Sequence, residues 1–275
     1  MSLSVNTNAG ALVALQNLTS TESQLQAAQN QVSTGLAVSS AQDDGAIFAI
    51  AQNQRGESSA LTAVVQSLQR VQSTVNVAAS SGTTVSGILN QLKSTALSAS
   101  DTSTNTASRL ALNATFTALL GQIKSVVSNS SFNGINLIDG SVANLAALAS
   151  TNGASKLTVA AQSLALGGAN ITVASTASIT TVTLAVAALA AVGASIKNVN
   201  NALAKLGSSA NALQTQITFT GNLQDTIDVG VGNLVNANLA KESATLTSLQ
   251  TKQSLGIQAL SIANASSQSL LSLFR

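Results

Sequence analysis

The chain lacks cysteine, histidine, tryptophan, tyrosine and proline throughout its 275 residues. Without a thiol or an imidazole, it lacks the side chains that often act as nucleophile, general base or transition-metal ligand. We therefore expect a protein that is not an enzyme and that binds no metal and no cofactor. The absence of proline also permits long, unbroken helices, because proline interrupts them.

Charged residues are scarce as well: they make up 7% of the chain, against roughly 25% in ordinary soluble domains. The eleven Lys and Arg residues are scattered singly and the formal charge is only +2, so we expect no binding of nucleic acid. The first basic residue is Arg55. A secretory signal needs a basic start, so we expect any export to use another route.

The longest stretch without charge runs from Leu157 to Ile196 and includes an apolar segment, Ile179 to Ile196. This segment consists mostly of Ala, Thr and Val, and it has no aromatic residues that would mark a membrane interface. We expect no insertion into a membrane.

Both ends of the chain repeat residues every seven positions, which is the spacing of a coiled-coil seam. The repeats are Ala11, Leu18, Leu25 and Val32, with Leu12, Leu15 and Ala28 beside them, and Leu239, Leu246, Gln253 and Leu260, accompanied by Leu249, Ala263 and Leu270. The other faces carry Ser, Gln, Thr, Ala and Asn, whereas an isolated surface helix normally carries charge there. We expect the two terminal helices to pair, and copies of the same chain to bury the pair.

The N-terminal helix has clear start and stop signals. Residues 6–8 offer caps, and Ser33-Thr34-Gly35 predicts the end, because glycine takes a left-handed cap without strain. Ser40 to Asp43 then fits a capping box for the next helix, with Asp44 as a second carboxylate in its first turn. Catalysis or cation binding by Asp43 and Asp44 is an alternative, but capping explains them more simply.

Three further helices follow a repeat of three and four residues, which is typical of a supercoiled bundle. Their apolar positions are Leu61, Val64, Leu68, Val71, Val75, Ala78, Gly82, Val85, Leu89, Leu92 and Ala96; Leu112, Phe116, Leu119, Ile123 and Val126; and Ala185, Leu189, Val192, Ile196, Val199, Leu203, Leu206, Ala210, Leu213 and Ile217. Arg55 and Glu57 lie on the polar side of the first helix, where an ion pair with another subunit competes with plain solvation.

Between the second and third of these helices the period changes to two. Asn133-Gly134 and Asp139-Gly140 predict turns, and Leu157 and Val159 alternate with polar residues as in a strand. Leu164 and Leu166 face Ile171 and Val173 across Gly167-Gly168, which predicts a β-hairpin. Further on, Val229 to Gly232 is the weakest stretch for a helix and is expected to link the bundle to the last helix.

The expected fold class is mainly α: a long coiled-coil helical bundle with paired terminal helices and a small central β segment. The expected parts are an N-terminal core helix (1–40), a helical hairpin (41–133), a β-containing insertion (134–183), a returning bundle helix (184–235) and a C-terminal core helix (236–275).

Three stretches resemble bacterial flagellin: VSTGLAVSSAQDDGAIFAIAQNQ at 32–54, FNGINL at 132–137, and LAKESATL at 239–246 followed by QALSIANASSQSLLSLFR at 258–275. The likeness is to short flagellins of the alphaproteobacterial type and covers about residues 1–140 and 185–275. It implies terminal helices that form an inner core lining a filament channel, with the bundle outside. The implied partners are copies of the chain, hook-junction and cap proteins, the flagellar export apparatus and a chaperone.

The resemblance also assigns individual residues. It places Ser40, Asp43, Asp44 and Arg55 in the motif entering the long bundle helix, Phe132, Asn133 and Gly134 in a turn, and Leu270, Leu271, Leu273, Phe274 and Arg275 in the C-terminal signature. All of these except Ser40 are expected at the subunit interface, together with the seam residues Leu18, Leu25, Val32, Leu246, Leu249 and Leu260.

These observations predict a secreted structural subunit that self-assembles into the bacterial flagellar filament used for swimming. The nearest alternative is a flagellar hook-filament junction protein, which shares the terminal helices, and a more distant one is a secreted coiled-coil adhesin. Polymer growth by the pure protein would distinguish them.

Overall fold

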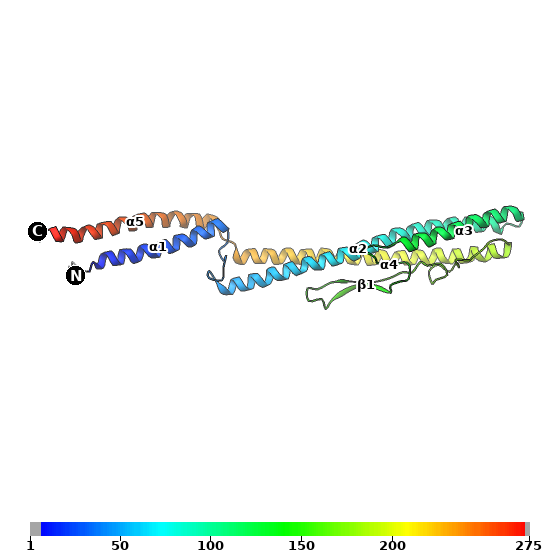
Figure 1. Ribbon diagram of the computed structural model, residues 1–275, viewed down its shortest axis with the longest axis horizontal. Coiled ribbons are helices and arrows are strands. Elements are labelled where there is room, and N and C mark those ends of the chain that lie inside the picture. Colours follow the sequence, from blue (N-terminus) through cyan, green and yellow to red (C-terminus); the bar gives the residue numbers. More distant parts are fainter. Residues whose placement is uncertain (1–6, 273–275) are drawn as a thin grey trace. The chain divides into compact units, whose positions relative to one another are not determined.

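The computed structural model of the chain describes residues 7–272, which form five helices and one two-stranded sheet. In chain order these are α1 (Ala9–Thr34), α2 (Gly45–Ser100), α3 (Thr106–Asn129), β1 (Asn144–Leu148), β2 (Lys156–Ala160), α4 (Val182–Val235) and α5 (Leu239–Ser272). The predicted fold class is confirmed: the chain is mainly α, its terminal helices pair, and its β segment is small (Figure 1).

Contacts within the chain define two compact units. The terminal unit takes the residues up to Gly56 and from Thr226 onward, and the central unit is Glu57–Asp225. Helices α2 and α4 each contribute residues to both units.

The core of the central unit forms along the predicted seam of α2. All eleven seam residues are buried, and Leu68, Val75 and Leu89 are completely enclosed. Phe116 of α3 and Val192 of α4 belong to the same hydrophobic cluster. The three helices therefore bundle because the three-four repeat gives each of them one apolar face.

Two of the described helices, α3 and α4, are long and apolar enough to cross a membrane. Both supply completely buried side chains to the core cluster, for example Ile123 of α3 and Leu213 of α4. The apolar residues of these helices thus form the core of the bundle. The apolar segment Ile179 to Ile196 is part of α4 from Val182 onward.

The small sheet pairs β1 with β2 in antiparallel, with Ala147 opposite Leu157. Ala147 and Val159 point inward and are buried, so the strand predicted from the alternation of Leu157 and Val159 is confirmed. The backbone N–H of Leu148 donates to Ser67 Oγ of α2 at 3.1 Å. This bond ties β1 to the bundle.

The hairpin predicted across Gly167-Gly168 is wrong. The structure has only an isolated bridge there, between Leu166 and Ile171, and the bridge is parallel. The backbone N–H of Thr172 instead donates to Ser195 Oγ of α4 at 3.0 Å. The Ser195 side chain of α4 therefore satisfies a backbone N–H that would otherwise pair with a second strand.

The helix break predicted at Val229 to Gly232 is also wrong, because α4 continues through this stretch to Val235. Glycine costs about 1 kcal/mol relative to alanine inside a helix. Val231 and Val235 are buried in a second hydrophobic cluster, and burying a valine contributes about 1.5 kcal/mol or more. The break follows Val235 instead, where Asn238 Oδ1 accepts the N–H of Lys241 at 3.2 Å and caps α5.

Candidate subunit interface

The terminal helices α1 and α5 pair, as the sequence predicts, and they lie side by side and antiparallel (Figure 1). In the described parts of these helices, only Ala28 and Leu249 are fully buried. Leu18, Leu25, Val32, Leu246 and Leu260 are half-buried, whereas the prediction that Leu239 belongs to the seam is wrong, because this residue at the start of α5 is 50% exposed. One chain alone therefore covers a single narrow face of each helix.

Two contacts fix the position of α1 along α5. A Cβ added to Gly256 would lie 3.2 Å from Leu18 Cδ1, so glycine allows a close approach of the helices. Asn8 Oδ1 accepts the N–H of Ala11 at 3.0 Å and caps α1, while Asn8 Nδ2 donates to the carbonyl of Ala263 at 2.8 Å. The same side chain thus caps one helix and binds the other.

At the other end of the pair, the connectors that leave α1 and α4 run side by side. The N–H of Ala37 donates to the carbonyl of Val235 at 2.7 Å, and the N–H of Ala237 donates to the carbonyl of Gly35 at 2.9 Å. Gly35 ends α1 with a φ of 73°, which confirms the predicted left-handed cap. Backbone hydrogen bonds therefore join the pair where it meets the rest of the terminal unit.

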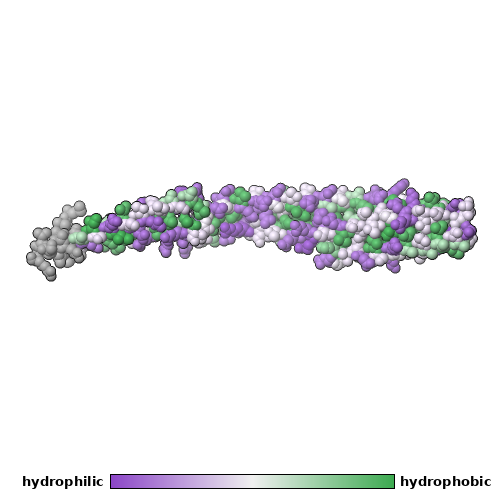
Figure 2. Space-filling view, turned by 90° about the horizontal axis from the view of Figure 1, so that it is seen from above, coloured by the Kyte–Doolittle hydropathy of each residue, from purple (hydrophilic) through white to green (hydrophobic). Residues whose placement is uncertain are grey.

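Large apolar side chains remain on the outer faces of the pair. Leu12 is 58% exposed and Leu15 49%, so the prediction that they widen the seam is wrong. A single partner helix covers only the positions that point directly at it. On α5, Leu255 and Ile262 are 57% and 71% exposed, and Figure 2 shows apolar residues among polar ones along this unit.

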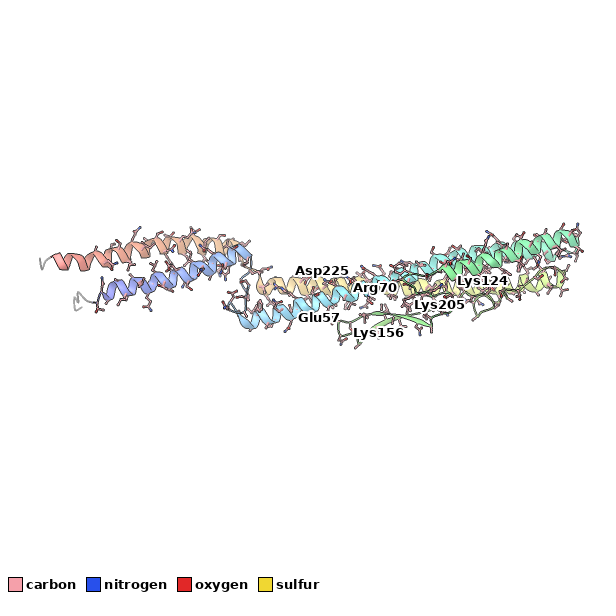
Figure 3. All side chains as sticks on the ribbon, in the orientation of Figure 1. Glu57, Arg70, Lys124, Lys156, Lys205 and Asp225 are labelled. Carbon is pink, nitrogen blue, oxygen red and sulfur yellow. The ribbon has the colours of Figure 1, made fainter. Side chains whose placement is uncertain are left out.

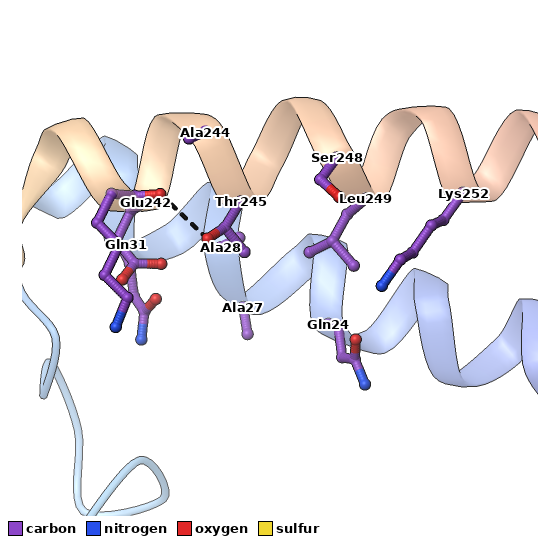
Figure 4. Close-up of a pocket in the computed structure, with 11 residues that line it drawn as sticks. Gln24, Ala27, Ala28, Gln31, Glu242, Ala244, Thr245, Ser248, Leu249 and Lys252 are labelled. Carbon is purple, nitrogen blue, oxygen red and sulfur yellow. Dashed lines mark hydrogen bonds between the residues drawn. The ribbon is translucent and has the colours of Figure 1, made fainter.

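A groove of about 560 Å³ runs beside the seam (Figure 4). The residues that line it are mostly small or uncharged, and the charged ones are Lys241, Glu242 and Lys252. Gln24 and Lys252 lie on the same side of the pair, and Thr245 Oγ1 is turned back to donate to the carbonyl of Lys241 at 3.0 Å. The groove is open, shallow and free of convergent catalytic groups, which suits a helix better than a small molecule.

The two adjacent carboxylates have different structural roles. Asp44 Oδ1 accepts the N–H groups of Ala46 and Ile47 at 2.9 and 3.0 Å, so Asp44 is the cap of α2. The predicted capping box from Ser40 to Asp43 is wrong, because α2 begins at Gly45 and Asp43 precedes the cap. Asp43 instead organises the connector before the helix.

The Asp43 carboxylate is surrounded by donors from Ser39 and Ser40. Its Oδ2 accepts the N–H of Ser40 at 2.9 Å, and the hydroxyl and N–H of Ser39, each at 2.9 Å. These hydrogen bonds hold the pKa of Asp43 below its ordinary value, and the bond from the Ser40 N–H has the largest effect. A lowered pKa means that the carboxylate favours the folded connector above the pKa of the unfolded chain, and that this contribution disappears as pH falls through the folded pKa.

A pH titration followed by NMR at the Ser40 amide should report the protonation of the Asp43 carboxylate. In the native chain we expect its NMR chemical shift to change with a midpoint below the ordinary carboxyl value of about 3.9. In Asp43→Asn the same amide should show no such step, because the titrating acceptor is gone. A midpoint at or above the ordinary value in the native chain would contradict the assigned hydrogen bonds.

Other residues implied by the resemblance lie elsewhere in the chain. Arg55 is exposed on α2. Glu57, which the sequence places with Arg55 on the polar side of this helix and which the resemblance does not assign, accepts a hydrogen bond from Thr151 Oγ1 at 2.6 Å. The charged side chains labelled in Figure 3 are dispersed singly along the central unit. Among the described residues, the predicted interface positions are divided between the terminal unit and the central unit.

The turn at Asn133-Gly134 is confirmed. The N–H of Phe132 donates to the carbonyl of Ile135 at 2.9 Å, and the reverse bond is 3.0 Å long. Asn133 and Gly134 have φ values of 50° and 77°, which is the left-handed pair that a tight two-residue turn requires. The turn leaves Phe132 37% exposed.

The C-terminal signature is only partly described. Leu270 and Leu271 belong to the last turns of α5. Leu273, Phe274 and Arg275 lie outside the described residues.

Sequence reasoning missed Arg109, the one charged residue classed as buried in the described part of the chain. Its Nε donates to the carbonyl of Ala99 at 2.9 Å, and its Nη2 donates to the carbonyls of Asp101 and Thr104 at 3.0 and 2.8 Å. Arg109 thus satisfies carbonyls at the end of α2 and in the loop to α3. A lone charge in the first turn of α3 gives no sequence signal for such a role.

Comparison with known proteins supports one family. The model of the bacterial flagellin N-terminal helical region matches residues 5–143, and that of the C-terminal helical region matches residues 189–274. Flagellin FljM of Caulobacter vibrioides is 50% identical over 272 residues, which cover 99% of this chain and 98% of that protein. A flagellin of Brucella melitensis is 34% identical, and the alignment covers 99% of both chains.

Among solved structures, the crystal structure of Bacillus cereus flagellin matches 55% of this chain and 86% of that chain, with 16% identity and a TM-score of 0.48. The family models and the full-length relatives decide the assignment. The chain belongs to the bacterial flagellin family, whose members self-assemble into the extracellular filament of the flagellum.

Proposed function

We propose that this flagellin, a structural subunit of the flagellar filament, polymerises through the outer surface of its α1–α5 pair. The observation that carries the proposal is the exposure of Leu12, Leu15, Leu255 and Ile262 on helices with few charges. Apolar patches of this kind on a soluble protein mark interaction sites. A head-to-tail contact that does not close on itself produces a helical polymer.

The proposed interface extends beyond these outer faces. It comprises Leu18, Leu25, Val32, Asp43, Asp44, Arg55, Phe132, Asn133, Gly134, Leu246, Leu249, Leu260, Leu270, Leu271, Leu273, Phe274 and Arg275. In this assignment residues 1–40 and 236–275 form the filament core, 41–133 and 184–235 form the surrounding bundle, and 134–183 form a small β-containing insertion. Half-buried seam residues support the assignment, since neighbouring copies can cover what one partner helix leaves open.

Other partners follow from membership of the family. We infer secretion through the flagellar export apparatus, delivery by a chaperone, and contacts with hook-junction and cap proteins at the ends of the filament. The lack of histidine and cysteine supports a purely structural role without catalysis. The full-length relatives reported above are named flagellins, which supports a filament subunit over a junction protein or an adhesin.

The test replaces exposed apolar residues and follows growth of the pure protein. Leu12→Ser combined with Leu255→Ser should leave the melting temperature of the monomer nearly unchanged, because both side chains are more than half exposed there. The critical concentration for elongation from native filament seeds should rise more than about tenfold, since burying each leucine contributes about 1.5 to 3 kcal/mol.

A matched control is Thr247→Ser, an exposed position on α5. It keeps the hydroxyl and should elongate seeds as the native chain does. Native growth by the double leucine variant would show that the outer faces of the pair do not build the polymer.

A further inference from the structure

The chain contains two Asn-Gly pairs, Asn133-Gly134 and Asn152-Gly153, and both lie in turns. In such a pair the backbone nitrogen of glycine can attack the carboxamide carbon of the asparagine before it, because glycine has no Cβ to hinder the close approach. The attack converts the amide to an acid without an enzyme. Both asparagine side chains are exposed, so the hydrogen bonds around each pair decide which of them can react.

The Asn152-Gly153 pair is held in place by hydrogen bonds. Asn152 Oδ1 accepts the N–H of Ala154 at 3.0 Å and the hydroxyl of Ser150 at 2.7 Å. The N–H of Gly153, whose nitrogen would make the attack, donates to the carbonyl of Ser150 at 3.2 Å. The carboxamide and the nitrogen are thus engaged with other partners, and these bonds must break before the two groups can meet.

The Asn133-Gly134 pair is free of such bonds. Within the described part of the chain, no residue bonds the side chain of Asn133, and the N–H of Gly134 has no acceptor. The two bonds of this turn run between Phe132 and Ile135, on either side of the pair, so they leave both reacting groups available. Asn133 also lines a surface hollow of about 180 Å³, which has room for water.

We propose that Asn133 is a deamidation site of the unassembled chain and that Asn152 is protected. The nitrogen of Gly134 gives its proton to hydroxide and bonds to Cγ of Asn133, and the amide group leaves as ammonia after taking a proton from water. Water then opens the cyclic imide. The net reaction consumes water, releases ammonia and needs no oxidant or reductant. Opening at the side-chain carbonyl gives aspartate, and opening at the main-chain carbonyl gives isoaspartate, whose main chain is longer.

Either product places a carboxylate where the chain has a neutral amide. Aspartate before glycine suits the same tight turn, because aspartate tolerates the positive φ that asparagine has there. Isoaspartate lengthens the main chain between Phe132 and Ile135, so it does not fit the two bonds that close the turn. Arg70 is the charged residue that lines the hollow with Asn133. The hollow therefore changes from cationic to neutral overall.

The timing of the reaction rests on the proposed function, which places Asn133 and Gly134 at the subunit interface. A neighbouring copy that covers the turn excludes the water that the reaction consumes. Deamidation then belongs to chains that await assembly, and it alters a surface through which they assemble.

Mass spectrometry of the folded monomer, incubated in mildly alkaline buffer, tests the site. Lys124 and Lys156 are consecutive basic residues, so trypsin releases one peptide that contains both pairs, and its fragmentation assigns the change to one asparagine. Conversion at Asn133 should be about tenfold faster or more than at Asn152, because each hydrogen bond that must break lowers the reactive population. Equal rates, or faster conversion at Asn152, would overturn the proposal.

The chain unfolded in guanidinium chloride is the reference. There the two asparagines should convert at similar rates, because the bonds that distinguish them are absent. A difference as large as that in the folded monomer would also overturn the proposal, since the sequence neighbours and not the hydrogen bonds would then explain it.

Ser150→Ala tests the protection directly, because it removes the hydroxyl that bonds Asn152 Oδ1. Conversion at Asn152 should become about threefold faster or more, while conversion at Asn133 should not change. The matched control is Ser128→Ala, an exposed position on α3, which should change neither rate. An unchanged rate at Asn152 in Ser150→Ala would contradict protection by these bonds.

The same measurement on filaments separates the site from the interface. Conversion at Asn133 should nearly stop in the polymer if neighbouring copies cover the turn. Equal rates in monomer and filament would remove this turn from the subunit interface and leave the deamidation site in place. A folded monomer that does not favour Asn133 would overturn the site and leave the proposed interface untouched.

Discussion

Deletion of Ser261 to Arg275 is expected to abolish filament growth while the central unit stays folded. The deleted segment contains Ile262, which is 71% exposed in the single chain, and further apolar residues at Leu270, Leu271, Leu273 and Phe274. Burial of these five side chains in a polymer is a gross gain of order 10 kcal/mol per subunit. The cost of ordering the segment reduces this gain in free energy. In the truncated protein the gain is nevertheless lost at every subunit that is added.

The central unit should survive because its hydrophobic cluster contains no residue of the deleted segment. The experiment adds purified truncated subunits to seeds cut from native filaments and measures elongation and far-ultraviolet helicity. This design bypasses export, so a segment needed only by a chaperone would leave elongation intact. Normal elongation would therefore assign the segment to export and remove it from the assembly surface.

Leu68→Asp is expected to be the most destabilising single change in the central unit. Leu68 is completely buried in the cluster of α2, α3 and α4, and an unpaired carboxylate there should cost several kcal/mol. At about 2 to 4 °C per kcal/mol for a unit of this size, the melting temperature should fall by roughly 10 °C or the unit should unfold.

The neighbour Gln69 provides the control, because it is exposed on the same turn of α2. Ser67 is less suitable, since its Oγ accepts the N–H of Leu148 and aspartate there would disturb β1 as well. Thermal denaturation of the monomeric variants decides the matter. Equal melting temperatures for Leu68→Asp and Gln69→Asp would contradict the three-four seam as the core of the bundle.

The long helices could be predicted from sequence because their periodicity is strong and repeated. Along α2 the steps of three and four residues recur over more than thirty positions, and no local exception offsets that pattern. The terminal pair was predictable for the same reason, as the burial of Ala28 and Leu249 shows. A seam of this kind needs only the spacing of apolar residues, which the sequence displays directly.

The β segment could be predicted only in part because its stabilising partners are distant in sequence. Strand β1, NLAAL, is rich in alanine and has no strand propensity to reveal it; its pairing with β2 and the bond from Leu148 to Ser67 make it a strand. The region after β2 alternates like a strand, yet Thr172 bonds to Ser195 of α4. In both places tertiary contacts outweigh the local pattern.

The candidate subunit interface, too, could be predicted from sequence only in part. Seam positions such as Leu18 and Leu246 follow from spacing, whereas the exposure of Leu12 and Leu15 depends on how narrow a face the partner helix covers. Asn8 was recognised as a possible cap, but its second bond to Ala263 joins residues 255 positions apart. Periodicity cannot supply such a pairing, because it holds no information about which seam residues meet.

That separation also sets the order of events in time. The chain is made from its N-terminus, so α1 leaves the ribosome long before the segment that holds Ala263 exists. Helices that lack a tertiary partner are only marginally stable in water, and contacts between distant residues form late. The first helix to be synthesised is thus among the last to reach its final partner, and the cell has an interval in which to move the chain before its two ends can close together.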